Sequence, residues 1–543
     1  MPAPRDGFAQ LVHAEWTKLR TVRGWMIGLV VAVVLTVGIG LLGPAGSQSE
    51  CGRADGSQGP CKMQSPPKDA AGQEVTDQKT FVRRTLSGDG SITARLTSMV
   101  GKYPAGGGSP TGDQGLVDGV LPWSKAGILV KDGTAAGSAY AAVLATGAHG
   151  VRMQYDYTGD LAGLPGPVSA AAPRWLRLTR VGDLLTGYDS VDGSTWTRIG
   201  SARLGGLPHD LQVGVFAASP DYAVIKDSFG GSSVTSGSSL ATGTFDQVAV
   251  TGQSPGEWTV PANGEGNGPW NGGPGGGNGP GGPGGPGAPR NPDSTPGSHP
   301  GAVATGADAF TVTGSGDVAP ASADEGSGKT LESSLAGTFA GLIAVVVVAA
   351  LTMTAEYRRG LIRTSLAATP RRGRLLAAKA TVLGAAAFGI GLIAAAAAVP
   401  IVTALERNKG LYVFHASTQA EIRLIVGTAA LLAVAAVLAL AVATIVRRGA
   451  VAVAAVIVVI VVPYVLATAS VLPAGAAEWL TRLTPAAAFA VQQTSTPWAQ
   501  VTHVYTPSNG YFPLSPWVGL AVLGLYAAAA YALAHRLLGR RDA

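Results

Sequence analysis

One stretch of the chain has residue types that bind phosphate in other proteins. Residues 325–330 read Glu-Gly-Ser-Gly-Lys-Thr, which resembles the end of a loop whose backbone amides and lysine hold a phosphate group. The complete pattern needs a glycine where Ala323 stands, a preceding strand and a following soluble helix. Here a Gly/Pro-rich segment precedes the stretch and an apolar run follows it. We therefore expect no nucleotide site on this chain.

Acidic side chains are the second candidates for chemistry. Hydrolysis of a glycoside needs two carboxylates at a set separation. Asp156, Asp160, Asp189 and Asp192 lie in or beside turn-like segments, where aspartate is common for backbone reasons. No catalytic pair can be assigned among them, and the two cysteines lack the neighbouring ligands of a zinc site. We expect neither a catalytic residue nor a metal site, which disfavours a membrane-bound glycosidase.

Six long apolar runs must position the rest of the chain. Each is close to the ~20 residues that cross a ~30 Å hydrocarbon core as a helix, and none contains Asp, Glu, Lys or Arg. A long polar segment separates the first run from the other five. The sequence predicts an α-helical polytopic membrane protein with six transmembrane helices and a water-soluble domain inserted after the first. The runs are Trp25–Leu42, Leu335–Thr354, Thr381–Val402, Leu424–Val446, Ala450–Val471 and Trp517–Leu533.

Basic residues beside the runs indicate the orientation, because short cytoplasmic segments are enriched in lysine and arginine. Sixteen such residues lie on the side of both termini and four on the other. We expect a multi-pass protein of the plasma membrane with both termini in the cytoplasm and the inserted domain outside. The net charge of +6 then reflects basic residues at the flanks of the spans that set the topology, and no nucleic acid is expected as a partner.

The two cysteines fit this orientation. Cys51 and Cys61 follow the first apolar run, within a connector that spans residues 45–79. In an oxidising compartment they can close a short loop, and such a bond contributes roughly 2–3 kcal/mol in the loop-entropy model. We predict a disulfide between them.

Residues 80–252 have a β-strand pattern. Short runs alternate apolar and polar residues and are separated by Gly, Asp, Pro and Ser, which is typical of an antiparallel sandwich. Six of these segments resemble, in order, strands of the concanavalin-A-like, laminin-G-like jelly-roll family. The resemblance implies an all-β jelly-roll sandwich domain of a kind that binds carbohydrate, binds protein or only packs. The segments are Gly88–Arg95, Trp123–Ile128, His149–Tyr155, Trp175–Arg180, Ser190–Trp196 and Phe245–Val248.

Aromatic residues of this domain are its candidate ligand-binding side chains. Tyr155, Tyr157, Tyr188 and Trp196 would offer sugars an apolar ring with a polar group attached. The competing interpretation, which we favour for Trp175 and Trp196, is that these two rings belong to the domain core. A glycan is therefore a candidate partner of the domain, and the presence of calcium is not decided by the sequence.

Residues 253–333 are predicted to be a Gly/Pro-rich disordered tether. Their composition buries too little apolar surface to fold, most clearly up to Gly301. A flexible chain of ~80 residues has a root-mean-square reach on the order of 50 Å. Such a tether would let the jelly roll move relative to the membrane.

Two segments beside the first two apolar runs have a second resemblance. Residues 8–25 place apolar side chains at helical spacing, which favours a helix lying at the membrane interface, so that residues 1–44 form an interfacial helix and the first span. The motif at residues 15–21 and the segment at residues 355–379 resemble those of actinobacterial type-2 ABC exporter permeases, and the six-span topology agrees. The motif residues are Glu15, Trp16, Lys18, Leu19 and Arg20, then Glu356, Tyr357, Arg358, Arg359, Leu361, Ile362 and Arg363.

This resemblance implies a permease subunit of an ABC exporter, with residues 334–543 forming five of its helices. It implies a separate ABC ATPase that carries ATP and Mg²⁺, no cofactor on this chain, and a homodimer or a second permease. The helix after the second span would dock the ATPase. Tyr357, Leu361 and Ile362 would supply its apolar anchor, and the three arginines its charged rim.

A second function hypothesis is a membrane-anchored, lectin-like protein that binds the cell envelope without transport. A simple anchor needs one span, so the five further helices favour the permease.

Overall fold

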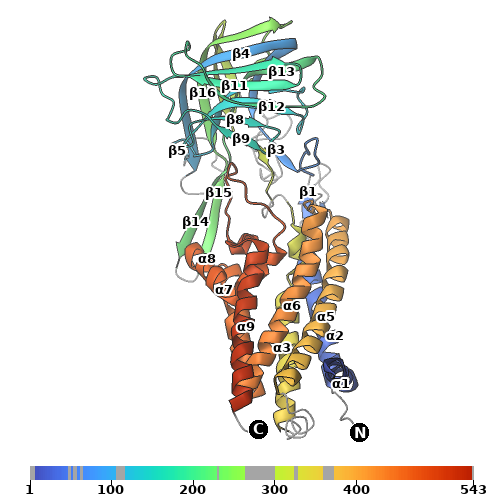
Figure 1. The fold of residues 1–543 in the computed structure, drawn as a ribbon. Coiled ribbons are helices and arrows are strands. Elements are labelled where there is room, and N and C mark those ends of the chain that lie inside the picture. Colours follow the sequence, from blue (N-terminus) through green and yellow to red (C-terminus); the bar gives the residue numbers. More distant parts are fainter. Residues whose placement is uncertain are drawn as a thin grey trace.

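The computed structural model describes residues 7–46, 50–52, 58–60, 65–104, 116–228, 231–262, 300–322, 328–358 and 372–540. A helical bundle is stacked end to end with a β domain (Figure 1). Both chain ends lie at the end of the bundle away from the β domain. We call this the terminal end, and the opposite end of the bundle the domain end.

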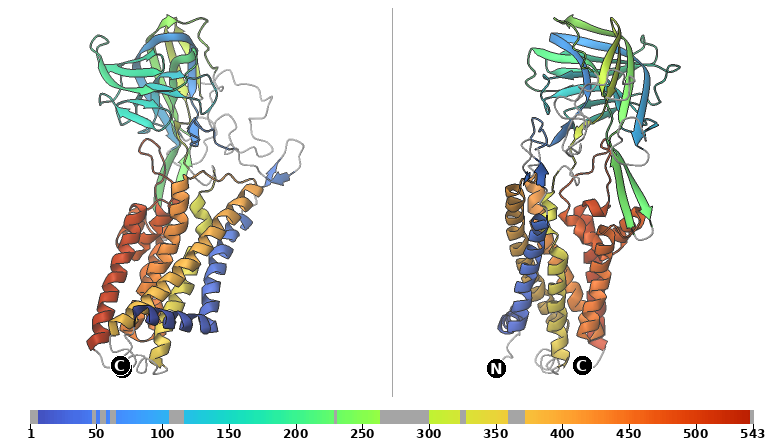
Figure 2. Two further views of the ribbon diagram at one scale, coloured as in Figure 1. Left: turned by 45° about the vertical axis from the view of Figure 1, so that its right-hand side comes forward. Right: turned by 180° about the vertical axis from the view of Figure 1, so that it is seen from behind.

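Six helices among the described residues are long and apolar enough to cross a membrane, which confirms the predicted number of spans. A shorter helix, α1 (Phe8–Thr21), lies across the terminal end of the bundle (Figure 2). The 3₁₀ helix η2 (Leu331–Leu335) leads into α3, whereas α8 (Ala474–Leu483), η3 (Pro485–Gln492) and η4 (Pro507–Asn509) lie between α7 and α9. The long helices are α2 (Arg23–Gly46), α3 (Thr338–Arg358), α5 (Arg372–Asn408), α6 (Thr418–Val446), α7 (Gly449–Thr468) and α9 (Pro516–Arg540).

Helix α6 is the centre of the bundle and packs against α3, α5, α7, α9 and η3. Its buried face is rich in alanine, including Ala435, Ala436 and Ala439, and small side chains let helices approach closely within a membrane. Gln492 at the end of η3 is buried among these helices. Its Nε2 atom donates to Oγ1 of Thr338 and to Oγ1 of Thr428, both at 2.9 Å.

The β domain is an antiparallel sandwich whose two sheets share strand β4. Residues 80–87 of β4 pair with β13, whereas residues 90–96 pair with β10. One half of the sandwich therefore continues through β13, β6, β7, β8 and β9, and the other through β10, β11 and β12. The main core lies between the halves and contains Ile92, Leu176, Val143 and Val215. This confirms the predicted inserted all-β domain.

The bounds of the strands are as follows: β1 (Glu50–Gly52), β2 (Gln58–Pro60), β3 (Val75–Asp77), β4 (Thr80–Pro104), β5 (Leu116–Asp118), β6 (Lys125–Lys131), β7 (Tyr140–Thr146), β8 (Val151–Tyr155), β9 (Gly159–Ala162), β10 (Arg174–Val181), β11 (Leu184–Ser190), β12 (Thr197–Arg203), β13 (Asp210–Ala218), β14 (Tyr222–Ser228), β15 (Gly231–Gly237), β16 (Leu240–Gln253), β17 (Gly301–Gly306), β18 (Ala309–Gly314) and β19 (Val318–Pro320).

The structure differs from the predicted tether at residues 300–322. Strand β18 pairs with β16 and β17, and β19 pairs with β3. Phe310 and Val312 are buried in the sandwich core. The Gly/Pro-rich residues 263–299 lie outside the described residues, but the strands before and after them belong to one sheet. The β domain therefore continues as far as β19, and residues 321–330 separate β19 from η2.

Candidate functional site

A cluster of charged side chains lies at the terminal end of the bundle, where α1 crosses the spanning helices. Helix α1 directs Glu15 and Leu19 into the bundle, and both are buried. Trp16 lies on its other side and is 43% exposed. An apolar ring on the outer side of such a helix suits contact with lipid at the membrane interface.

Lys379, near the start of α5, lies between two carboxylates. Its Nζ atom is 2.7 Å from Oε2 of Glu15 on α1 and 2.7 Å from Oε1 of Glu356 near the end of α3. Lys18 contacts the same two residues, at 2.8 Å from Oε1 of Glu15 and 3.3 Å from Oε1 of Glu356. We call these four residues the charge cluster. Its charges balance, and it joins α1 to α3 and α5, which lie more than 300 residues further along the chain.

Burial and charge act against each other in the charge cluster. Burial raises the pKa of the Glu15 carboxyl, but the Lys379 and Lys18 ammonium groups outweigh it and hold this pKa below its ordinary value. Burial lowers the pKa of Lys18, yet its two carboxylate partners raise it overall. Both groups are therefore charged at neutral pH. A cavity of about 20 Å³ adjoins the cluster, with Trp25 and Thr352 in its wall, which is room for about one water molecule.

Further contacts brace the terminal end beside the charge cluster. The guanidinium of Arg447, in the turn between α6 and α7, lies 5.1 Å from the ring centroid of Tyr357. Nη1 of Arg372, the first residue of α5, donates to the carbonyl oxygen of Leu538 near the end of α9 at 2.9 Å. The ends of α3, α5, α6 and α9 are thus linked in pairs, and a displacement of one end is resisted by its neighbours.

The structure brings together residues of the predicted interfacial helix and of the predicted ATPase-coupling segment. Glu15, Lys18 and Glu356 meet in the charge cluster, whereas Arg20 and Arg358 are exposed. Arg359, Leu361, Ile362 and Arg363 lie outside the described residues, so their role remains a prediction. Sequence reasoning missed Lys379 as the link. A lysine at the edge of an apolar run looks like any other basic flank, and the two carboxylates that it contacts lie on other helices.

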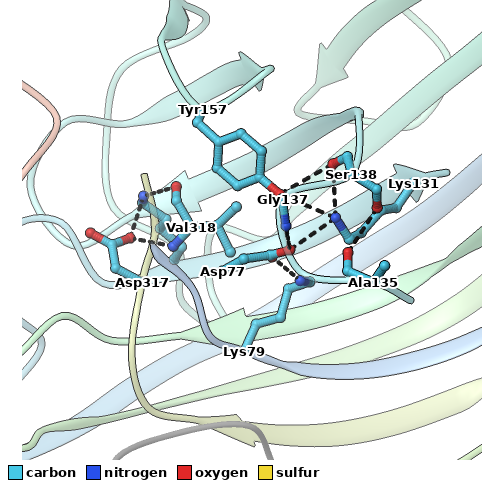
Figure 3. A network of polar contacts seen from close by, with 10 residues as sticks. Asp77, Lys79, Lys131, Ala135, Gly137, Ser138, Tyr157, Asp317 and Val318 are labelled. Atoms are coloured by element: carbon cyan, nitrogen blue, oxygen red, sulfur yellow. Dashed lines mark hydrogen bonds and ion pairs between the residues drawn. The ribbon is translucent and has the colours of Figure 1, made fainter. Parts of the chain in front are cut away.

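Tyr157 is not available to a ligand, contrary to its place among the candidate aromatics. It is 1% exposed and lies under β3 and β19 in a second, smaller core on the far side of strands β6 and β7. Its hydroxyl donates to Oδ2 of Asp77 at 2.9 Å (Figure 3). The alternating sequence around Tyr157 does not reveal that a second layer covers this face of the sheet.

Asp77 organises the buried polar network around Tyr157. Its carboxylate forms ion pairs with Lys79 and with Lys131, the latter at 2.9 Å, and accepts the backbone N–H of Gly137 at 3.0 Å. Burial raises the pKa of Asp77, but the two lysines outweigh it and lower the pKa to about 2. Burial lowers the pKa of Lys131 to about 8. This network fastens β3 to β6 and is structural.

The other candidate aromatics divide into two places. Tyr155 on β8 packs against the main core. Tyr188 on β11 is half-buried and faces Arg177 in the β10–β11 register, and the Arg177 guanidinium lies 3.9 Å from the ring centroid of Trp196. Trp175 is likewise half-buried, with Arg95 at 5.7 Å from its ring. Trp175 and Trp196 thus lie on the outer face of the sandwich, which differs from the core position that we favoured for them.

Cys61 and the side chain of Cys51, which the predicted disulfide would join, lie outside the described residues. The backbone of Cys51 pairs with Gly59 in the β1–β2 hairpin. Within the described part of the chain, no group of three or more His, Cys, Asp or Glu residues is placed to hold a metal ion.

Six helices long and apolar enough to cross a membrane, with α1 joined to them by buried ion pairs, define a polytopic membrane protein. The chain belongs to the ABC-2 transporter family, because the family model described as ABC-2 family transporter protein matches residues 10–543. It is therefore the membrane permease of an ABC transporter, a transport subunit, and an ABC ATPase is the general partner of such a permease. No curated protein matches the chain.

Solved structures resemble only a part of the chain. They include a functionally unknown protein from Saccharomyces cerevisiae, at 16% identity over 36% of this chain and 84% of that chain, with a TM-score of 0.18. Scytalido-glutamic peptidase with a transition state analog inhibitor matches at 11% identity over 34% and 84%, with a TM-score of 0.20. Lectin I-B4 from Griffonia simplicifolia, in metal-free form, matches at 11% identity over 36% and 91%, with a TM-score of 0.15. These scores are too low to bear on function.

Proposed function

We propose that this permease is the membrane subunit of an exporter, and that a separate ATPase bound at its terminal end supplies ATP and Mg²⁺. The charge cluster is the observation that supports this most. It joins the interfacial helix to the ends of α3 and α5, at the place where residues 359–371 connect these two helices. A partner that moves this connection also moves Glu356, and through Lys379 it moves α5 and α1.

Buried ion pairs suit the transmission of such a movement. Separating Lys379 from either glutamate would break a buried ion pair and leave that carboxylate only the half-exposed Lys18 as a partner, which is unfavourable. The helices that carry these residues are therefore expected to move as one unit. In this proposal Tyr357, Leu361 and Ile362 form the apolar contact with the ATPase, and Arg358, Arg359 and Arg363 meet acidic groups around it.

Co-purification tests the ATPase contact. The full chain is affinity-purified from its own membranes as wild type and as the triple variant Tyr357→Ser, Leu361→Ser, Ile362→Ser. We expect the wild type to retain an ABC ATPase and to stimulate its ATP hydrolysis, and the variant to insert normally but lose the ATPase. A matched control is the exposed, apolar Val451→Ser at the start of α7. Equal retention of the ATPase by the triple variant would refute the contact.

In the same proposal the terminal end is cytoplasmic, the β domain lies outside the plasma membrane, and two permeases act together as a homodimer or as a pair of different chains. The sixteen-to-four distribution of basic residues supports the orientation. Mass measurement of the detergent-purified complex tests the pairing: two copies of this chain support a homodimer, one copy with a second permease supports a pair, and one copy alone argues against both.

The β domain has a glycan or another envelope ligand as its proposed partner. Tyr188 and Trp196 lie together beside Arg177 on the outer face of the sandwich, so this face offers aromatic and cationic groups at one place. Binding of the full chain to an array of envelope glycans is the test, with Trp196→Ala against Tyr155→Ala as its control. Loss of binding in the first variant alone supports the site. A lectin-like anchor without transport would bind glycan but retain no ATPase.

A further inference from the structure

The β domain is fastened to the loop between α5 and α6. Glu74, just before β3, is 1% exposed. Its Oε1 atom accepts the Tyr412 hydroxyl at 2.7 Å and the backbone N–H of His415 at 3.1 Å. Lys68 lies 3.4 Å from the same oxygen. Burial raises the pKa of Glu74, but these donors lower it overall, so the contact is made by a buried carboxylate.

The same loop also holds the segment that leads into α3. The backbone N–H of Lys329 donates to the carbonyl oxygen of Tyr412, and the backbone N–H of Phe414 donates to that of Lys329, both at 2.8 Å. Lys329 and Val413 thus form a parallel bridge. The β domain, the lead-in to α3 and the α5–α6 loop are therefore joined at one place.

A second loop, residues 493–515 between η3 and α9, rises from the bundle to the β domain (Figure 1). Nε2 of Gln500 donates to the carbonyl oxygen of Thr158, in the turn between β8 and β9, at 3.3 Å. Oγ of Ser322 and Nδ1 of His503 are 3.4 Å apart. The rings of His503, Tyr505 and Tyr511 pack edge to face at centroid distances of 4.8–5.3 Å, which makes this loop a compact unit.

The two attachments differ in strength. Hydrogen bonds to an ionised group are roughly twice as strong as neutral ones, and a buried carboxylate that loses its donors bears its full desolvation penalty. The Glu74 attachment has both properties. The contacts of Gln500 and Ser322 are long, and the Gln500 contact joins two neutral groups. When the helices of the bundle shift relative to one another, the attachment to the η3–α9 loop should therefore separate first.

We infer that the β domain is an outer clamp of the permease, which stays on the α5–α6 loop and releases the η3–α9 loop once in each transport cycle. This inference rests on the proposed function, because ATP hydrolysis by the partner must drive the release. It replaces the freely moving, tethered domain that composition suggests with a domain whose docking changes with the state of the helices. Ligand capture by the β domain would then be linked to the movement of α9.

Thiol crosslinking in native membranes tests the clamp. The variant Thr158→Cys, Gln500→Cys is built with Cys51→Ser and Cys61→Ser, and treated with a short bis-maleimide. The control pair Lys329→Cys, Val413→Cys joins the lead-in to α3 to the α5–α6 loop, so it reports whether that loop keeps its place. Each is measured without nucleotide, with ATP, and with ATP and vanadate. We expect the first pair to crosslink well without nucleotide and several-fold less with ATP and vanadate, and the control pair to be unchanged.

Three outcomes would overturn the clamp. If the ATPase co-purifies and hydrolyses ATP but the first pair crosslinks equally in all states, the clamp is wrong and the proposed function stands. If both pairs decrease together, the α5–α6 loop itself is rearranged, so the domain has no fixed attachment and the inference is wrong. If no ATPase co-purifies, the proposed function fails and the clamp fails with it.

A further variant, Glu74→Ala, should lower crosslinking of the first pair even without nucleotide, because the domain has then lost its stronger attachment.

Discussion

Lys379 is buried between two carboxylates, and we expect this single side chain to contribute strongly to the stability of the helical bundle. Its replacement by methionine keeps the length of the side chain but leaves Glu15 and Glu356 to share Lys18. Removing one partner of a buried ion pair typically costs about 3 kcal/mol or more. We expect Lys379→Met to lower the apparent melting temperature of the purified permease and to abolish stimulation of the ATPase, measured by thermal unfolding in detergent and by ATP hydrolysis.

Lys18 is the matched control for this prediction. It contacts the same two carboxylates, but its side chain is 43% exposed, and pairs open to solvent contribute about 1 kcal/mol or less. Lys18→Met should therefore change the melting temperature little. Equal melting temperatures for the two variants would show that burial does not distinguish the lysines, and the account of the charge cluster would have to be abandoned.

Asp77 gives the β domain a defined response to acid. Its pKa is about 2 in the folded domain and 3.8 ordinarily, so the folded state holds fewer protons between these values. The stabilisation, about 2 kcal/mol, is complete above the ordinary pKa and is lost as the pH falls from about 4 through 2. Unfolding of the β domain in the wild type and in Asp77→Asn, followed between pH 7 and 2, should show a smaller acid dependence in the variant. Parallel curves would contradict the assignment.

At the scale of elements, the hairpin of β17 and β18 is the clearest addition to the sandwich. Phe310 is 1% exposed, and its ring lies 5.3 Å from that of Trp258. Phe310→Ala should destabilise the domain by about 3–5 kcal/mol, because burial is lost and a cavity forms. Val303→Ala, at a 40% exposed position of β17, should change stability by about 0.5 kcal/mol or less. Tryptophan fluorescence during urea unfolding measures both. A Phe310→Ala variant as stable as the wild type would indicate that this segment is not part of the domain core, as the predicted tether implied.

The elements that sequence could predict are those whose signal is local. The six spans are uniformly apolar over the thickness of a bilayer, and strands such as Trp175–Arg180 alternate apolar and polar residues over part of their length, so the sequence predicts both kinds of element. Strands β17 and β18 follow a long Gly/Pro-rich stretch, and β18 pairs with residues of β16 that lie about 70 positions earlier in the chain, as in Gly243 with Val312. The burial of Tyr157 and the position of Lys379 likewise depend on contacts between distant elements, which a local pattern does not contain.

At the scale of the whole molecule, the β domain and the bundle are stacked along one axis (Figures 1 and 2). Buried charged groups lie at both ends of the bundle. The charge cluster links α1, α3 and α5 at the terminal end, and Glu74 fastens the β domain at the domain end. Because α5 runs from Lys379 to the loop that holds Tyr412, it is the element that connects the two. A displacement of the terminal end of α5 is therefore the most direct route by which the β domain can respond.

The orientation of this axis across the membrane is tested together with the disulfide. Cys51 and Cys61 are expected to be bonded outside the cell, where closing their loop contributes roughly 2–3 kcal/mol. An impermeant maleimide added to intact cells should label neither cysteine until a reductant is present, and both afterwards. Labelling of both native cysteines without reductant would rule out the bond.

The orientation is tested in the Cys51→Ser, Cys61→Ser background. Val303→Cys in the β domain should be labelled in intact cells, and Arg20→Cys on α1 only after permeabilisation. Labelling of Arg20→Cys but not Val303→Cys in intact cells would reverse the orientation, and would place the charge cluster out of reach of any cytoplasmic ATPase.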